Sequence, residues 1–229
     1  KIYLSKINYL LDQGFNFKHI VIFIDISDFY DDTNFYSIDD NLIVTEKYSK
    51  KKNLKRRKFL RRNFPLTNFY MFVIKKYKFK KENNNKVEDN KLPVFTEKVD
   101  LKAKWTYSKK DELEGYDIGI KEGHKLMTSH MAQLYEILNK NNIKMSLAVY
   151  PWPHQLNNDI ENSLQVTIWK EFCENRCENF INYFPFFFDD MNSSSYLETY
   201  KKYYFKNDPH FNKLGHKILA EKLIGIFNN

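Results

Sequence analysis

The chain has 229 residues, a net charge of +8 and an aromatic content of 17%. This length suits one sizeable α/β domain that buries a substantial core. No apolar run approaches the ~18 residues needed for a membrane span, and no signal peptide is visible, so neither feature is expected within these residues.

A helix and a buried strand are predicted first. Apolar residues recur at helical spacing over residues 2–11, and Gly14 is expected to end that helix. Residues 19–26 form a continuous apolar run rich in β-branched side chains, which is typical of a parallel strand covered by helices on both faces. The sequence therefore opens with the beginning of an α/β fold.

Polar side chains follow this strand directly. Ligands of parallel sheets bind beyond the carboxyl ends of the strands, so Asp25, Ser27 and Asp28 are predicted to face any active site. Ser27 and Asp28 equally suit a simple cap on the turn after the strand. Asp31 and Asp32 add negative charge that suits a divalent cation, but no glycine-containing loop of EF-hand spacing accompanies them, and we predict no metal ion.

Residues 29–115 lose the regular pattern and are predicted to be an insertion over the catalytic face of the sheet, because long insertions at this position tend to form lids or substrate walls. Within it, the basic run of residues 50–62 begins at Lys50 and ends at Arg62. This run suits an anionic membrane surface or an acidic glycan, or is only a solvated helix face; a nucleic-acid partner is not expected. Trp105 and Tyr107 suit either stacking on a sugar ring or the core.

The next helix and strand form a crossover unit. Residues 118–141 carry apolar side chains on one helical stripe, and residues 143–150 read as a second strand, as in a doubly wound sheet. This strand delivers Trp152, His154 and Gln155 to the same rim as Ser27, where they are candidates for substrate binding. The prolines beside them also suit a loop that is simply rigid.

The histidines and cysteines of the helices do not predict a metal site. His124 and His130 are six residues apart, which is not a ligand spacing on a helix, so both are interpreted as packing or surface residues. Cys173 and Cys177 lack the second pair that a zinc site needs. Because both are placed on adjacent turns of a helix over residues 163–177, we expect free thiols.

The last third of the chain adds one more strand before the C-terminal loop. Residues 179–185 are predicted as a third strand, and Phe186, Phe187 and Phe188 are expected to pack the loop after it. The serines of residues 193–195 suit a turn or a helix N-cap and not a nucleophile, because no glycine flanks them to form a strained elbow.

The loop before the last helix holds the best catalytic candidates. Apolar residues at helical spacing follow Asn212, a good N-cap, so Asp208 and His210 are placed on the loop that enters this helix. An aspartate beside an imidazole fixes its tautomer and stabilises the imidazolium that forms when histidine takes a proton from a nucleophile. The alternative is an ordinary Asp-Pro turn with a partly buried loop histidine.

The sequence Asp208-Pro209-His210-Phe211-Asn212, followed by Leu-Gly-His and an amphipathic helix, resembles the last block of the SGNH (GDSL-type) hydrolases, especially those that add or remove acyl groups on carbohydrates. The resemblance implies that Asp208 and His210 are the Asp and His of a Ser-His-Asp triad, although the spacing is D-x-H instead of the commoner D-x-x-H. It also aligns residues 25–28 with the family's G-x-N-D block. Ser27 then stands where the family has its oxyanion-binding Asn, and a serine hydroxyl can donate one such bond.

The nucleophile block of this family is missing. No Gly-Asp-Ser occurs in the 229 residues. The resemblance places it after a strand upstream of the first helix, so we expect the serine to lie before Lys1. The alternatives are that catalysis has been lost, or that Ser27 itself attacks.

The sequence therefore predicts a three-layer, flavodoxin-like doubly wound α/β domain over residues 1–229, with the insertion after its first visible strand. By resemblance it is a serine esterase or O-acyltransferase without a cofactor, acting on acylated carbohydrate of the cell envelope, and located in the periplasm, outside the cell or at a membrane. The alternative is an inactive SGNH-like module that binds an acidic glycan or a membrane surface through residues 50–62.

Overall fold

The computed structural model describes residues 1–47 and 92–228. The chain divides into two compact units, one made of Lys1–Lys47 with Pro93–Asn229 and the other of Tyr48–Leu92. The basic run of residues 50–62 and most of the predicted insertion therefore lie outside the described residues. Among the described helices, none is both long enough and apolar enough to cross a lipid bilayer.

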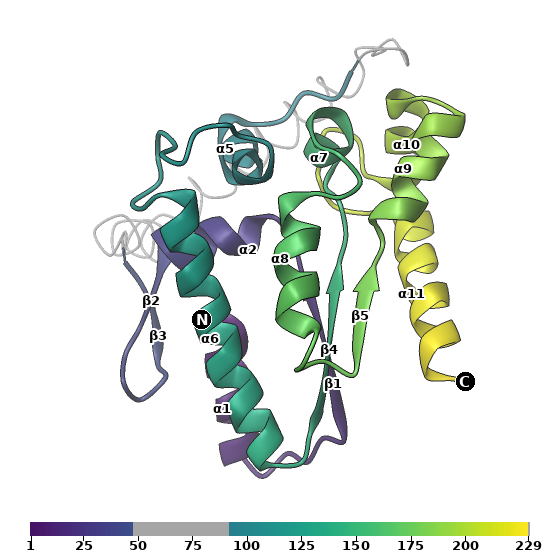
Figure 1. Ribbon diagram of the computed structural model, residues 1–229. Coiled ribbons are helices and arrows are strands. Elements are labelled where there is room, and N and C mark those ends of the chain that lie inside the picture. The colour runs from purple at the N-terminus through teal and green to yellow at the C-terminus, as the bar shows by residue number, and fades with distance from the viewer. Residues whose placement is uncertain (48–91, 229) are drawn as a thin grey trace, which may run out of the picture. The chain divides into compact units, whose positions relative to one another are not determined.

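A parallel sheet of three strands forms the centre of the first unit (Figure 1). Its strands are β1 (His19–Ile24), β4 (Lys144–Val149) and β5 (Asn179–Asn182), in the order β1-β4-β5. The register pairs Ile24 with Val149 and Val149 with Asn182, so all three strands end at one edge. The predicted α/β fold with a parallel sheet is confirmed, and each strand lies within a predicted one.

Helices cover both faces of this sheet. Helices α1 (Ile2–Asp12), α6 (Ile120–Lys140) and α8 (Leu164–Cys173) pack on the face that carries Ile22 and Ile24. Helix α11 (Lys213–Phe227) lies against the opposite face, where the Phe227 ring contacts His19 at 4.9 Å between centroids. Side chains alternate between the faces of a strand, so a continuous apolar run is what burial on both sides requires.

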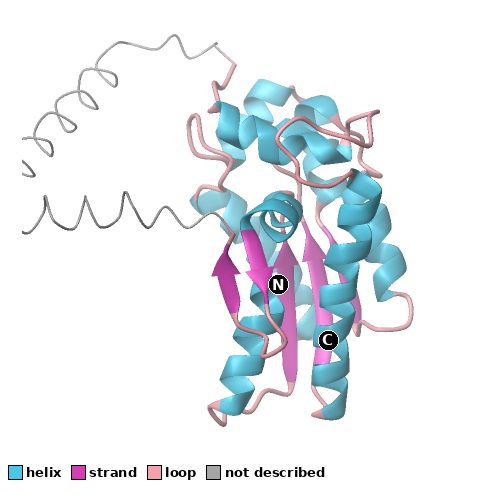
Figure 2. Cartoon of the chain, turned by 90° about the vertical axis from the view of Figure 1, so that its left-hand side faces the viewer, coloured by secondary structure: helices cyan, strands magenta, loops and turns pink. Residues whose placement is uncertain are grey.

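Short elements gather beyond the carboxyl ends of the strands, where Figure 1 shows α5 and α7 past the arrow tips. After β1 come α2 (Ser27–Tyr30), the π-helical turn η1 (Asp31–Phe35) and an antiparallel hairpin, visible in Figure 2, of β2 (Tyr36–Ile38) and β3 (Val44–Glu46). Helix α5 (Glu97–Ala103) and the 3-10 turn η2 (Lys104–Thr106) follow the undescribed residues. Helix α7 (Pro153–Asn158) follows β4, whereas α9 (Phe184–Ser193) and α10 (Tyr196–Tyr203) follow β5.

Several predicted local signals are confirmed. Gly14, just past the end of α1, has a φ of +82°. The Asn212 side chain caps α11 by accepting hydrogen bonds from the backbone N–H groups of Leu214 and Gly215. Ser195 caps α10 in the same way, through the N–H of Glu198. Trp105 is 1% exposed and belongs to the core, which decides between its two predicted roles.

Two predictions for the chain around β5 were wrong. Cys173 and Cys177 form a disulfide and are not free thiols. Helix α8 ends at Cys173, so Cys177 lies in the following turn with its Cα 4.7 Å away, within the range that a disulfide needs. The three phenylalanines after β5 lie in helix α9 and not in a loop, because Pro185 occupies the first turn, where proline favours helix initiation.

Candidate functional site

Asp208 and His210 form the predicted pair. The Nδ1 atom of His210 lies 2.5 Å from Oδ1 of Asp208, and the same oxygen accepts the His210 backbone N–H at 2.8 Å. An aspartate at Nδ1 selects the tautomer that leaves Nε2 free to accept a proton. The His210 side chain is 73% exposed, and its Nε2 has no hydrogen-bond partner in the part of the chain that the structure describes. The pair therefore has the orientation of a catalytic base.

Backbone and side-chain bonds hold this loop in place. Asn207 adopts a left-handed conformation with a φ of +54°, which turns the chain into Asp208. The Phe205 N–H donates to the His210 carbonyl at 3.0 Å. The Tyr200 hydroxyl donates to the Phe205 carbonyl at 2.6 Å and accepts from the Asp208 N–H at 3.3 Å. The loop is thus fixed from both of its ends.

The turn after β1 holds Asp25, Ser27 and Asp28. Asp25 Oδ1 accepts the Ser27 backbone N–H at 2.6 Å, and Asp28 Oδ2 accepts the Asp25 N–H at 3.0 Å. Asp28 Oδ2 also accepts the Tyr3 hydroxyl at 2.7 Å. The partly exposed Ser27 makes no side-chain hydrogen bond to any described residue, so its hydroxyl is available to a ligand.

The Asp28 carboxyl group has a perturbed pKa. Burial raises the pKa of Asp28 to about 8, and the nearby Asp25 carboxylate adds to the effect, although hydrogen bonds from Tyr3 and from the Asp25 backbone oppose it. Asp28 is consequently protonated for the most part at neutral pH. The Asp28 side chain therefore accepts the hydrogen bonds from Tyr3 and from the Asp25 backbone mainly as a neutral carboxylic acid.

Tyr150 links this turn to the His210 loop. It follows the central strand β4, and its hydroxyl lies 3.4 Å from Asp25 Oδ2. Its ring contacts that of Phe211, the residue after His210, at 5.3 Å between centroids. The Ser27 turn and the His210 loop therefore stand at the same edge of the sheet, and the Tyr150 side chain contacts Asp25 of the turn and Phe211 of the loop.

The candidate substrate-binding residues after β4 lie mostly inside the protein. Trp152 is 6% exposed and Gln155 is fully buried, with Oε1 accepting the Trp152 N–H at 3.0 Å and Nε2 donating to Gln165 at 2.9 Å. His154 is also buried, and its Nε2 lies 2.8 Å from Asp100 Oδ1. Helix α7 packs these side chains into the protein interior beyond the carboxyl end of β4. Their contact with substrate stays a prediction that requires the rim to open.

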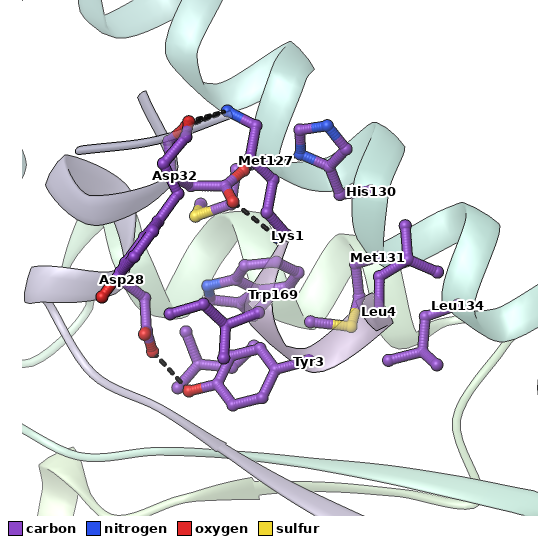
Figure 3. A pocket seen from close by; sticks show the side chains of 13 residues that line it. Lys1, Tyr3, Leu4, Asp28, Asp32, Met127, His130, Met131, Leu134 and Trp169 are labelled. Carbon is purple, nitrogen blue, oxygen red and sulfur yellow. Dashed lines mark hydrogen bonds and ion pairs between the residues drawn. The ribbon is translucent and has the colours of Figure 1, made fainter. Parts of the chain in front are cut away.

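A cavity of about 30 Å³ lies beneath the Asp28 turn (Figure 3). Sequence reasoning missed a buried hydrogen-bonded pair in its lining, in which His130 Nδ1 lies 2.7 Å from Asp32 Oδ2. Although burial favours the neutral acid, the hydrogen bond from His130 holds the pKa of Asp32 below its usual range. His130 lies 98 residues from Asp32, so spacing carried no signal for this pair.

The acidic residues after the turn, Asp31 and Asp32, are bonded to other side chains of the protein. Asp31 pairs with Lys102 at 2.6 Å, and Asp32 pairs with His130. Across residues 1–47 and 92–228, no group of three or more acidic, histidine or cysteine side chains is arranged to hold a metal ion.

Comparisons with protein families, with curated proteins and with solved structures find no match to this chain. Its function is therefore inferred from the site residues and from the resemblance of its short motifs.

Proposed function

We propose that this protein is an SGNH-like serine esterase or O-acyltransferase that acts on acyl groups of carbohydrate. The observation that carries the proposal is the Asp208–His210 pair, with Nδ1 bonded to the carboxylate and Nε2 open. The position of Ser27 at the same sheet edge supports it, through the Tyr150 bridge.

In the proposed reaction, a serine Oγ attacks the acyl carbonyl carbon while its proton passes to Nε2 of His210. Asp208 stabilises the imidazolium, and the Ser27 hydroxyl donates to the developing oxyanion. The imidazolium then protonates the leaving sugar oxygen, and water or a second sugar hydroxyl attacks the acyl-enzyme by the reverse steps. As the resemblance implies, the attacking serine is proposed to stand in a Gly-Asp-Ser motif preceding Lys1.

The proposed site of action is the cell envelope or the extracellular space. The Cys173–Cys177 disulfide supports this location, because such bonds persist mainly in oxidising compartments.

The test is hydrolysis of p-nitrophenyl acetate by the full natural protein. We expect activity that His210→Ala lowers by about a thousandfold or more, and that Asp208→Asn lowers by roughly 10²–10⁴-fold because the imidazole loses its orienting carboxylate. His216→Ala is the matched control, since His216 is exposed on α11 and belongs to neither the pair nor the turn. Equal activity in the His210→Ala variant and the natural protein would overturn the proposal.

A second candidate function is a catalytically inactive SGNH-like module that binds an acidic glycan or a membrane through residues 50–62. It is favoured by the absence of a Gly-Asp-Ser in the sequence and by the basic charge of that run. If the full protein has no esterase activity and binds vesicles of anionic lipid or an acidic polysaccharide, this function replaces the first.

A further inference from the structure

One short segment contacts residues that adjoin the His210 loop and the Ser27 turn, and also helix α7. Residues 94–105, here called the brace, comprise a short extended stretch, helix α5 and the start of η2. We propose that the brace positions the His210 loop and the Ser27 turn relative to each other. The positioning residues are Asn207, which binds the first end of the brace, and Trp105, which forms its second end. This inference rests on the proposed function, in which the loop and the turn act on one substrate.

The first end of the brace holds the His210 loop. The Val94 backbone N–H donates to Oδ1 of Asn207 at 3.0 Å, across 113 residues of sequence. Asn207 is the left-handed residue directly before Asp208. The adjacent Phe95 ring contacts Tyr200 edge-on at 6.1 Å, and the Tyr200 hydroxyl accepts the Asp208 N–H.

The middle of the brace is fixed to the rim. The Phe95 ring lies 4.1 Å from the His154 ring, and Asp100 bonds His154 Nε2 at 2.8 Å. Lys102 pairs with Asp31, just after α2. These contacts link the brace to α7 and to the segment after β1.

The second end holds the Ser27 turn. The Trp105 indole N–H donates to the Ile26 carbonyl at 2.7 Å, in a fully buried position. The Ile26 carbonyl and the Ser27 N–H belong to the same peptide group, and Asp25 accepts that N–H at 2.6 Å. The peptide that orients Ser27 is therefore held from both sides, by Trp105 and by Asp25.

Neither positioning residue needs to touch substrate. A misplacement of about 1 Å in a catalytic group can cost about a hundredfold in rate, so a frame that fixes two groups on separate elements affects kcat more than KM.

The first test compares Trp105→Phe with Trp169→Phe in the full natural protein. Both tryptophans are almost fully buried, but the Trp169 indole N–H has no hydrogen-bond partner among the described residues. We expect Trp105→Phe to lower kcat by about ten- to a hundredfold at unchanged KM, while Trp169→Phe leaves kcat near that of the natural protein. Exchange of the Ser27 amide hydrogen, followed by NMR, should become roughly fivefold faster in Trp105→Phe alone.

The second test asks whether the brace acts as one unit. Asn207→Gly keeps the left-handed backbone accessible and removes only the side-chain acceptor for Val94. If the brace is a unit, the loss of kcat in the Trp105→Phe/Asn207→Gly double variant is smaller than the product of the two single losses.

The outcomes separate the brace from the proposed function. The positioning role of the brace is overturned if Ser27 amide exchange is unchanged in Trp105→Phe. It is also overturned if the loss of kcat in the double variant equals the product of the two single losses. If the natural protein has no esterase activity, the proposed function fails. The exchange rates of the Ser27 and Asp208 amides in the same variants then decide whether the brace holds the two segments.

Discussion

At the scale of single residues, the raised pKa of Asp28 predicts how the stability of the fold depends on pH. Its folded-state pKa of about 8 lies above the ~3.9 of an aspartate in an unfolded chain. The folded protein therefore retains a proton at Asp28 that the unfolded chain has lost. The stability linked to this group is fully present below about pH 4 and is lost as the pH rises towards 8.

Asp28→Asn should remove this pH dependence, because the amide is neutral throughout. We expect the urea midpoint of the natural protein to fall between about pH 5 and about pH 8 by more than that of Asp28→Asn. Parallel pH profiles for the two proteins would contradict a protonated Asp28.

At the scale of elements, helix α11 reaches the His210 loop through Gly215. A Cβ atom at this position would lie 2.5 Å from the Tyr203 carbonyl oxygen and 2.6 Å from a ring carbon of Phe211. The absence of a side chain therefore lets the first turn of α11 pack directly on the loop that carries Asp208 and His210.

Two alanine substitutions in α11 test this close approach. Gly215→Ala should lower the free energy of unfolding by about 1–3 kcal/mol, because backbone and ring must both shift. Gly225→Ala, in the same helix, places its Cβ where no described atom beyond the neighbouring backbone of the helix lies within 4 Å, and should raise the free energy of unfolding by roughly 0.5–1 kcal/mol. Chemical denaturation measures both. Destabilisation of equal size by the two changes would show that close packing at Gly215 is not the cause.

At the scale of the whole molecule, the first unit is built from two pieces of sequence. All six residues of β1 pair with β4, although residues 48–91 intervene between the two strands. Trp105 and Lys102 add bonds to Ile26 and Asp31 across the same gap.

Cleavage of the chain within residues 48–91 should therefore leave the two pieces associated. A protease site introduced there, followed by cutting and size-exclusion chromatography, is expected to give one peak containing both fragments. Separation into two folded or aggregated species would show that the covalent connection, and not the β1–β4 pairing, keeps β1 in the sheet.

Sequence alone predicts the frame of this fold well, because each strand and crossover helix has its own periodic pattern. The runs over residues 19–26 and 143–150 are local signals, and so is Asn212 before an amphipathic helix. The Asp208–His210 pair was predictable for the same reason, since its members are only two positions apart in the sequence.

Contacts between distant residues were not predictable in this way. Neither Trp105 with Ile26 nor Asp100 with His154 shares a spacing that marks a motif, and each forms only when the insertion returns to the sheet edge. The disulfide was missed for a different reason: the prediction carried α8 four residues too far, which placed both cysteines inside a helix.

The openness of the His210 imidazole distinguishes it chemically from most of the other histidines. His130 and His154 are buried in pairs with aspartates, whereas the His210 side chain is 73% exposed and its Nε2 is unbonded among the described residues. An acylating reagent such as diethyl pyrocarbonate should therefore carbethoxylate His210 and the exposed His216 well before His130 or His154, as peptide mass mapping would show. Under the proposed function, this covalent modification of His210 is expected to abolish esterase activity while the fold stays intact.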